Sequence, residues 1–245
     1  MGLLPSSECA LVASTTHSAS PIDAGSLATG EPGWLNANAF ALDQRPRCDM
    51  IPIALHEAVP GHHLQRALAN ELPGLRAFRR DLAFPAFVEG WAIYAERLGI
   101  EMGMYATTDA EVGRLCRSLR EAAAMVADTG MHGMGWSRDR AIAYLREQAE
   151  LSESESRSEV DRAITWPGLA CAGPIGAMKM LQLRSTAASA LGEQFRLRAF
   201  HDVLLSGGAI PLPQLEDRVR HWIDAERSRG SGTGDSHFSN IMKHA

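Results

Sequence analysis

The 245-residue sequence has few cysteines, much less lysine than arginine, and no long apolar run. Its four cysteines lie far apart and form no C-x-x-C pair, which argues against a disulfide framework and against a zinc knuckle. No apolar stretch approaches the roughly 18 residues that a membrane-spanning helix needs. The N-terminus also lacks the basic start and apolar core of a secretory signal. These absences predict a cytoplasmic protein with reduced thiols and no membrane partner.

Positive charge is scarce as well, and this limits the partners. The net charge is -5 at pH 7, and the arginines are interspersed with acidic residues, so no basic stripe stands out. This balance argues against nucleic acid as the main partner. The hydrophobic fraction of 45% and the charged fraction of 22% are typical of a globular protein, and the length suffices for one sizeable domain.

The spacing of apolar residues predicts a mainly α fold. Residues 1–30 are rich in Ser, Thr, Ala, Gly and Pro without periodicity, so we expect a flexible lead-in there. We expect residues 31–229 to form one helical domain, with at most a marginal β segment near residues 33–40, and residues 230–245 to form a disordered tail. We expect helices at 50–72 (interrupted at Pro60-Gly61), 75–82, 87–102, 110–129, 138–147, 152–164, 176–191, 197–204 and 213–227.

A histidine-rich run, His56-Glu57-Ala58-Val59-Pro60-Gly61-His62-His63, is followed by Glu89 in an apolar segment. Neutral imidazoles and a carboxylate can hold a metal ion, and a second carboxylate can activate water. However, the sequence lacks the usual H-E-x-x-H spacing, because Pro60 stands four residues after His56. On a regular helix His56 and His62 would lie about 240° apart, and His56 and His63 about 10 Å apart along the axis. Neither pair could then bind one ion.

Pro60 and Gly61 change this expectation. A bulge at these residues would bring a later histidine back beneath His56, and we favour His62 as the second ligand with His63 as the fallback. The alternative is a kinked helix whose histidines lie on a partly exposed face. Glu89 pairs with an arginine such as Arg97, binds a cation, or faces solvent at the start of its helix.

Several separate motifs, in order, resemble the bacterial domain-of-unknown-function family 885, whose members look like gluzincin-type zinc metallopeptidases. The resemblance runs from residue 35 to residue 222. It rests on residues 55–65, 87–96, 128–132, 135–137, 159–162, 166–168 and 200–202.

The resemblance implies a zincin-like helical metallohydrolase domain that cleaves a peptide or a small amide substrate. His56, His62 and Glu89 would be the zinc ligands, and iron or manganese stays open as the metal. Glu57 would be the general base that takes a proton from the metal-bound water. His132 would donate to the developing oxyanion, oriented by Asp128 four residues earlier. The alternative for these last two is an ordinary surface pair.

The chain departs from the family pattern in two ways. Family members are usually much longer, so the resemblance implies the C-terminal catalytic half only, with a homo-oligomer or an N-terminal partner half left open. After Trp166-Pro167-Gly168, the positions of the family's Gln, Tyr and Lys hold Leu169, Gly173 and Pro174. Two other functions therefore stay open. One is a metal-dependent biosynthetic enzyme that acts on a small molecule, and the other is a non-catalytic helical partner domain.

Overall fold

The computed structural model describes residues 4–6, 8–14, 22–23, 32–38 and 46–232. The fold is mainly helical, which confirms the predicted class. The strands are β1 (Cys9–Ser14), β2 (Ile22–Asp23) and β3 (Gly33–Asn38). Two short 3-10 helices are η2 (Arg47–Asp49) and η3 (Gly192–Gln194). The α-helices are α1 (Met50–Glu57), α2 (His62–Glu71), α3 (Ala77–Asp81), α4 (Pro85–Glu101), α5 (Thr108–Met134), α6 (Arg138–Ala149), α7 (Glu153–Thr165), α8 (Leu169–Leu191), α9 (Leu197–Leu205) and α10 (Leu212–Gly232).

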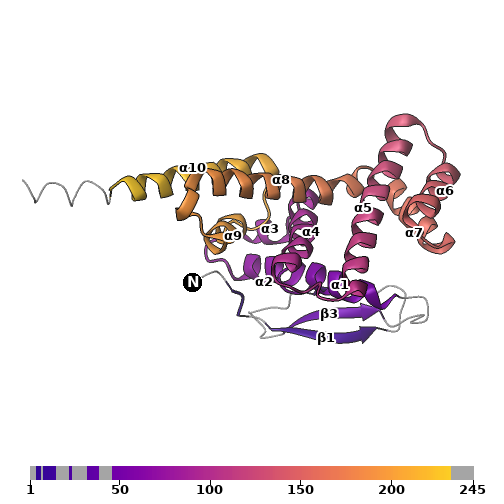
Figure 1. Ribbon diagram of the computed structural model, residues 1–245, viewed down its shortest axis with the longest axis horizontal. Coiled ribbons are helices and arrows are strands. Elements are labelled where there is room, and N and C mark those ends of the chain that lie inside the picture. The colour runs from indigo at the N-terminus through magenta and orange to yellow at the C-terminus, as the bar shows by residue number, and fades with distance from the viewer. Residues whose placement is uncertain (1–3, 7, 15–21, 24–31, 39–45, 233–245) are drawn as a thin grey trace, which may run out of the picture.

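The strands form a small sheet in the order β1-β3-β2, drawn beneath α1 and α2 in Figure 1. β1 runs parallel to β3, and β2 runs antiparallel to it. β3 confirms the strand predicted near residues 33–40, of which 39 and 40 lie outside the described residues. β1 and β2, however, fall within residues 1–30, so a flexible lead-in is wrong for these two segments. Both pair with β3, and such non-local pairing leaves no clear periodic signal in segments of six and two residues.

Two hydrophobic clusters hold the helices together. The larger one surrounds Phe87, Trp91 and Tyr94 of α4, which pack with residues of α2, α8, α9 and α10. The smaller one joins α5, α6 and α7 through Ala127, Leu145 and other buried residues. In Figure 1, α4 is central and α5, α6 and α7 lie to its right. Fully burying one large apolar side chain contributes about 1.5–3 kcal/mol, so these clusters fix the helices that line the site.

Helices α4 and α8 cross at very short range because glycines stand at the contact. A Cβ atom added to Gly90 would lie 2.7 Å from Cα of Gly176, and one added to Gly176 would lie 1.7 Å from the carbonyl oxygen of Ala86. α8 begins at Leu169, earlier than the predicted start at 176, and Pro174 lies inside it. Gly173 and Pro174 are therefore part of the helix and do not interrupt it.

The remaining helices follow the prediction closely, with shifted ends. α5 continues beyond the predicted residue 129 to Met134, where Gly135 takes a left-handed conformation. α10 reaches Gly232, beyond the predicted end at 227, and residues 233–245 of the expected tail lie outside the described residues. Within the described ranges, no helix combines the length and the apolar character needed to cross a membrane.

Candidate metal centre

The helical segment is interrupted between His56 and His62, and this interruption brings the two histidines together. α1 ends at Glu57, and α2 begins at His62 after a four-residue connection. The structure thus has two separate helices where the sequence predicts one helix with a bulge. At Gly61 an added Cβ would lie 1.8 Å from the carbonyl oxygen of His56, so only glycine fits. The indole N–H of Trp91 donates to the carbonyl oxygen of Pro60 at 2.8 Å and anchors the connection to α4.

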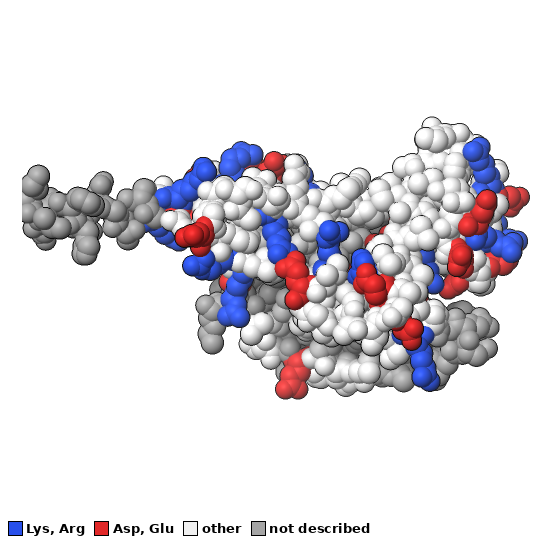
Figure 2. Space-filling model, viewed as in Figure 1, with Lys and Arg blue, Asp and Glu red and all other residues white. Residues whose placement is uncertain are grey.

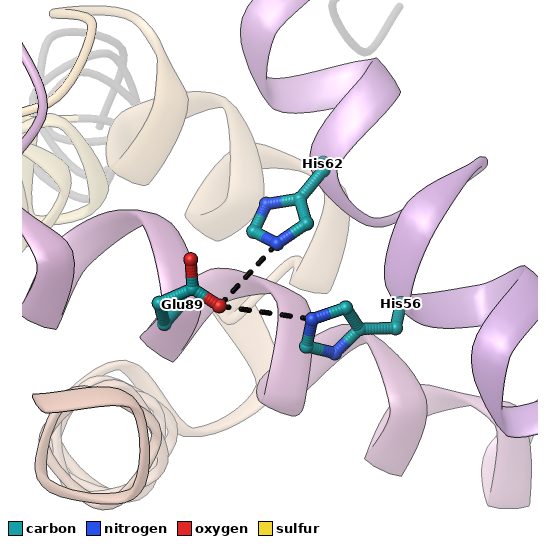
Figure 3. A group of neighbouring side chains, drawn as sticks. All are labelled: His56, His62 and Glu89. Carbon is teal, nitrogen blue, oxygen red and sulfur yellow. Dashed lines mark ion pairs between the residues drawn. The ribbon is translucent and has the colours of Figure 1, made fainter. Parts of the chain in front are cut away.

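Three side chains from three helices converge on one point (Figure 3). His56 comes from α1, His62 from α2 and Glu89 from α4. Oε2 of Glu89 lies 3.7 Å from Nε2 of His56 and 3.5 Å from Nε2 of His62. All three ligand atoms lie within 4.8 Å of one another. Both histidines are buried, and the Glu89 side chain is 40% exposed.

These distances suit a zinc ion. Zinc binds histidine nitrogen and carboxylate oxygen at about 2.0–2.2 Å, so neighbouring ligand atoms of a tetrahedral site lie roughly 3.3–3.5 Å apart. The two distances from Glu89 to the histidines are close to that spacing. His63 cannot contribute from its present position, because it is fully buried in the core and outside the cluster. The structure therefore places His62, and not the fallback His63, beside Glu89.

The charges and hydrogen bonds around the cluster keep the carboxylate of Glu89 ionised. Burial raises the pKa of Glu89, but hydrogen bonds with His56 and His62 outweigh it and hold that pKa well below its ordinary value. Burial lowers the pKa of His56, whereas hydrogen bonds to Glu89 and Glu96 raise it to about 9. The described residues show no arginine paired with Glu89, so the Arg97 alternative is not what the structure has. Positive charge at this point stabilises the carboxylate in its ionised form.

Glu96 contacts His56 on the side of the imidazole away from Glu89, and the sequence did not lead us to it. Its Oε1 accepts a hydrogen bond from Nδ1 of His56 at 2.5 Å and one from Nε of Arg117 at 2.7 Å. Arg117 also pairs with Glu121 at 3.6 Å. Burial, with the charge of Glu96 nearby, raises the pKa of Glu121 to about 7. A carboxylate that holds the far nitrogen of a ligand histidine fixes its tautomer and its orientation.

Glu57 lies beside the cluster with one oxygen unsatisfied. It is the residue after His56 and lines the same cavity as His56, His62 and Glu89. Its Oε2 atom is shielded from solvent and has no hydrogen-bond partner in the described part of the chain. A buried carboxylate oxygen without a partner is costly, so it marks a place for a water molecule or a ligand.

The cluster opens into a cavity of about 680 Å³. Residues of α1, α2, α4, α5, α7 and α8 line it, and many of them are charged. The acidic residues are Asp49, Glu57, Glu89, Glu121, Glu155 and Glu159, and the arginines are Arg66, Arg117, Arg120 and Arg162. A cavity of this size accommodates a small ligand or a few residues of a peptide. On the face drawn in Figure 2, basic and acidic side chains are mixed, with no single basic patch.

Asp128 and His132 lie together as predicted, and Asp128 also contacts the start of α8. The carboxylate of Asp128 is buried and accepts hydrogen bonds from the backbone N–H groups of Gly168, at 3.0 Å, and Ala170, at 3.2 Å. It therefore holds the start of α8, and this also explains why α8 begins early. Nδ1 of His132 lies 2.8 Å from Oδ1 of Asp128. Neither residue is among those that line the cavity, and the role of His132 as an oxyanion donor stays a prediction.

The positions that depart from the family pattern do line the cavity. Leu169, Gly173 and Pro174 face it from the first two turns of α8. A Cβ atom added to Gly173 would lie 2.8 Å from Cδ1 of Ile93 and 3.1 Å from Cβ of Glu89. A larger residue at Gly173 would therefore displace neighbours of the metal cluster. None of the three brings a side-chain hydrogen-bond donor to this wall.

The fold and the site together define a class of protein. It is mainly helical and carries a His-His-Glu cluster in a charged cavity. Residues 7–219 match the family of bacterial proteins of unknown function called DUF885, and the chain belongs to this family. Among curated proteins, none matches the chain.

Two solved structures are similar to this chain. One is described as a "putative lipoprotein" from Colwellia psychrerythraea, with 35% sequence identity and a TM-score of 0.86 over 91% of this chain and 39% of that one. The other, from Shewanella oneidensis, is described as a "putative lipoprotein of unknown function" and has 24% identity and a TM-score of 0.66. This second match covers 76% of this chain and 36% of the other protein. At this level of identity it shows a similar fold and nothing more. This chain thus spans less than half the length of either protein. The cytoplasmic location expected from the sequence stays a prediction.

Proposed function

We propose that this protein is a zinc-dependent hydrolase of peptide or related amide bonds, with a zincin-like catalytic domain. The proposal rests on one observation: His56, His62 and Glu89 converge within 4.8 Å beside Glu57, at the floor of a cavity. Two imidazoles, one carboxylate and an open side are typical of catalytic zinc sites and less typical of structural ones. We also propose that the chain corresponds to the C-terminal catalytic part of longer family members.

The zinc ligands, Glu57 and Glu96 have separate roles in the proposed hydrolysis. A zinc ion held by this ligand set would polarise the amide carbonyl and lower the pKa of water to about 7. Glu57, whose Oε2 has no partner among the described residues, takes a proton from the attacking water. The water oxygen bonds to the carbonyl carbon, the carbon–nitrogen bond breaks, and Glu57 passes the proton to the departing amine. Glu96 keeps His56 in the orientation that points Nε2 toward Glu89.

A second candidate is a metal-dependent biosynthetic enzyme that acts on a small molecule. Leu169, Gly173 and Pro174 favour it, because this wall of the cavity lacks the side-chain donors that the family pattern has there. Losing one oxyanion donor costs roughly 100- to 1000-fold in rate, so a peptidase would be weakened by this change. Turnover of one tailored metabolite, with no cleavage of generic peptides, would favour this candidate.

Metal content is the deciding experiment. Purified protein, incubated with zinc and dialysed, is expected to hold nearly one zinc ion per chain by mass spectrometry, and His56→Ala and Glu89→Ala are expected to lose it. His221→Ala, which removes an exposed histidine of α10, is the matched control and should keep the metal. Full occupancy by iron or manganese would favour the biosynthetic candidate. If no metal binds, both enzyme proposals fail, and a helical partner domain remains.

Hydrolysis is tested separately with a peptide library. Cleavage should be lost in Glu57→Gln, by about 100- to 10,000-fold, while this variant keeps its metal. Equal cleavage by the wild type and Glu57→Gln would contradict the assignment of the general base.

A further inference from the structure

Arg66 is a cavity residue that the proposed chemistry leaves unused. It is four residues after His62 in α2, so it lies on the same face of that helix, one turn further on. Helical side chains lean toward the N-terminus of their helix, which directs Arg66 back toward His62. Arg66 lines the same cavity as His56, His62 and Glu89. A cation therefore stands about one helical turn from the metal cluster.

The other arginines of the cavity are already paired. Arg117 pairs with Glu96 and Glu121, Arg120 with Asp49 at 2.8 Å, and Arg162 with Glu159 at 2.6 Å. Arg66 has no hydrogen bond or ion pair to any described residue. Its guanidinium can therefore bind an anionic group of a ligand without first giving up a partner.

The helix that carries Arg66 is firmly fixed. Every other residue from His62 to Ala69 is buried, and Arg66 alone is exposed. The backbone of Arg66 is thus held by the larger hydrophobic cluster, to which Leu64 and Leu68 belong. The backbone of Arg66 is fixed, and its guanidinium has no partner among the described residues. This arrangement suits the recognition of a carboxylate, which arginine binds with two parallel hydrogen bonds.

We propose that Arg66 binds the free α-carboxylate of the substrate, so that the protein acts on the C-terminal ends of peptides or on amides with an equivalent carboxylate. This inference rests on the proposed hydrolase function. One helical turn is about 5.4 Å, and an extended residue spans roughly 3.3–3.6 Å. The backbones of His62 and Arg66 are thus separated along α2 by the length of one or two extended residues, and we place the carboxylate that far beyond the bond that is cleaved. The protein releases a single amino acid or a dipeptide, and Arg66 sets this specificity.

The test compares matched peptides that differ only at the C-terminus. N-acetylated dipeptides and tripeptides of mixed sequence are offered to the zinc-loaded protein either as free acids or as C-terminal carboxamides, and products are followed by mass spectrometry. We expect kcat/KM to favour the acids by about 10- to 100-fold, mainly through KM, and Arg66→Ala to abolish this preference. Arg66→Lys keeps the positive charge but not the two parallel N–H donors of the guanidinium, so it should retain part of the preference for the free acids. Arg198→Ala removes an exposed, unpaired arginine of α9 and is the matched control.

Binding to the zinc-loaded Glu57→Gln variant separates this inference from the hydrolase proposal. Calorimetry with the same acid and carboxamide peptides needs no turnover. Tighter binding of the acids, lost when Arg66→Ala is added, supports the inference even if the wild type cleaves nothing, in which case only the hydrolase proposal fails. Equal affinity for acids and carboxamides, binding of neither, or an acid preference that survives Arg66→Ala would overturn the role of Arg66. Thermal melts of Arg66→Ala should match the wild type, because the side chain is exposed.

Discussion

Glu96 accepts a hydrogen bond from Nδ1 of His56 at 2.5 Å, on the opposite side of the imidazole from Glu89. Both acids come from α4, seven residues apart, and so lie on nearly the same face of that helix. One helix therefore supplies a ligand of the cluster and also the support of a second ligand. Arg117 donates to the same oxygen of Glu96.

Glu96→Gln should weaken metal binding without removing it. The amide still contacts His56 but loses the charge that strengthens the ligand, and such changes typically cost 10- to 100-fold in affinity. Competition with a chelating dye measures the dissociation constant. Glu101→Gln is the matched control on α4, because Glu101 pairs with Arg184 outside the metal cavity. Unchanged affinity in Glu96→Gln would show that the contact is not a support of the metal site.

Gly61→Ala should disrupt the connection that unites the two histidines. The new Cβ would lie 1.8 Å from the carbonyl oxygen of His56, so the backbone must move, at a cost of about 1–3 kcal/mol. We expect a lower urea midpoint and a large loss of metal affinity. Gly133→Ala is a matched control inside α5, where an added Cβ meets nothing within 4 Å. It should stabilise the protein by up to roughly 1 kcal/mol, since alanine favours helix more than glycine does. Equal effects of the two changes would contradict the close approach at Gly61.

The sequence predicted the helices well and pointed to the side chains that the structure brings together, because both leave local signals. The helical spacing of apolar residues, and the crowding of His56, Glu57 and His62 around Pro60-Gly61, can be seen without a structure. Glu96 also had a signal that our reasoning did not use, since its spacing from Glu89 is two helical turns. The way in which His56 and His62 come together left no signal in the sequence. Pro60-Gly61 is equally compatible with a bulged helix and with two separate helices.

Non-local contacts explain what the sequence did not predict. β1 is a strand because it pairs with β3, more than twenty residues away, and its own residues give no sign of that partner. Asp128 and His132 share a helix face and are in contact, but Asp128 also accepts hydrogen bonds from Gly168 and Ala170, which are 40 and 42 residues further along the chain. No local pattern predicts where a helix start will meet a buried carboxylate.

Asp128→Ala should destabilise the fold, whereas His132→Ala should not. The aspartate change leaves the backbone N–H groups of Gly168 and Ala170 without their partner, at a cost of about 1–3 kcal/mol. His132 is about one-third exposed, and its removal should stay within roughly 0.5 kcal/mol. Urea denaturation measures both, and metal content should be unchanged in His132→Ala. A 100-fold fall in kcat for His132→Ala, at unchanged stability, would restore the oxyanion role that the sequence suggested.

The stability of the protein should fall in acid partly because of His201. This histidine packs against Trp91 and Phe200, and its Nε2 lies 2.8 Å from the hydroxyl of Tyr94. Burial lowers the pKa of His201 to about 4, and the charge of Arg184 adds to the effect. Because the unfolded chain binds this proton at about pH 6.5 and the folded chain only near pH 4, stability is complete above pH 6.5 and declines as the pH falls toward 4.

The loss should reach at most about 3 kcal/mol. Urea midpoints at several pH values, compared between the wild type and His201→Gln, isolate this contribution from that of the carboxylates. His221→Gln, in an exposed position of α10, should keep the pH dependence of the wild type. If His201→Gln and the wild type lose stability in parallel between pH 6.5 and 4, His201 is not held neutral by the fold. The contact with Tyr94 would then tie α4 to α9 without making the core sensitive to acid.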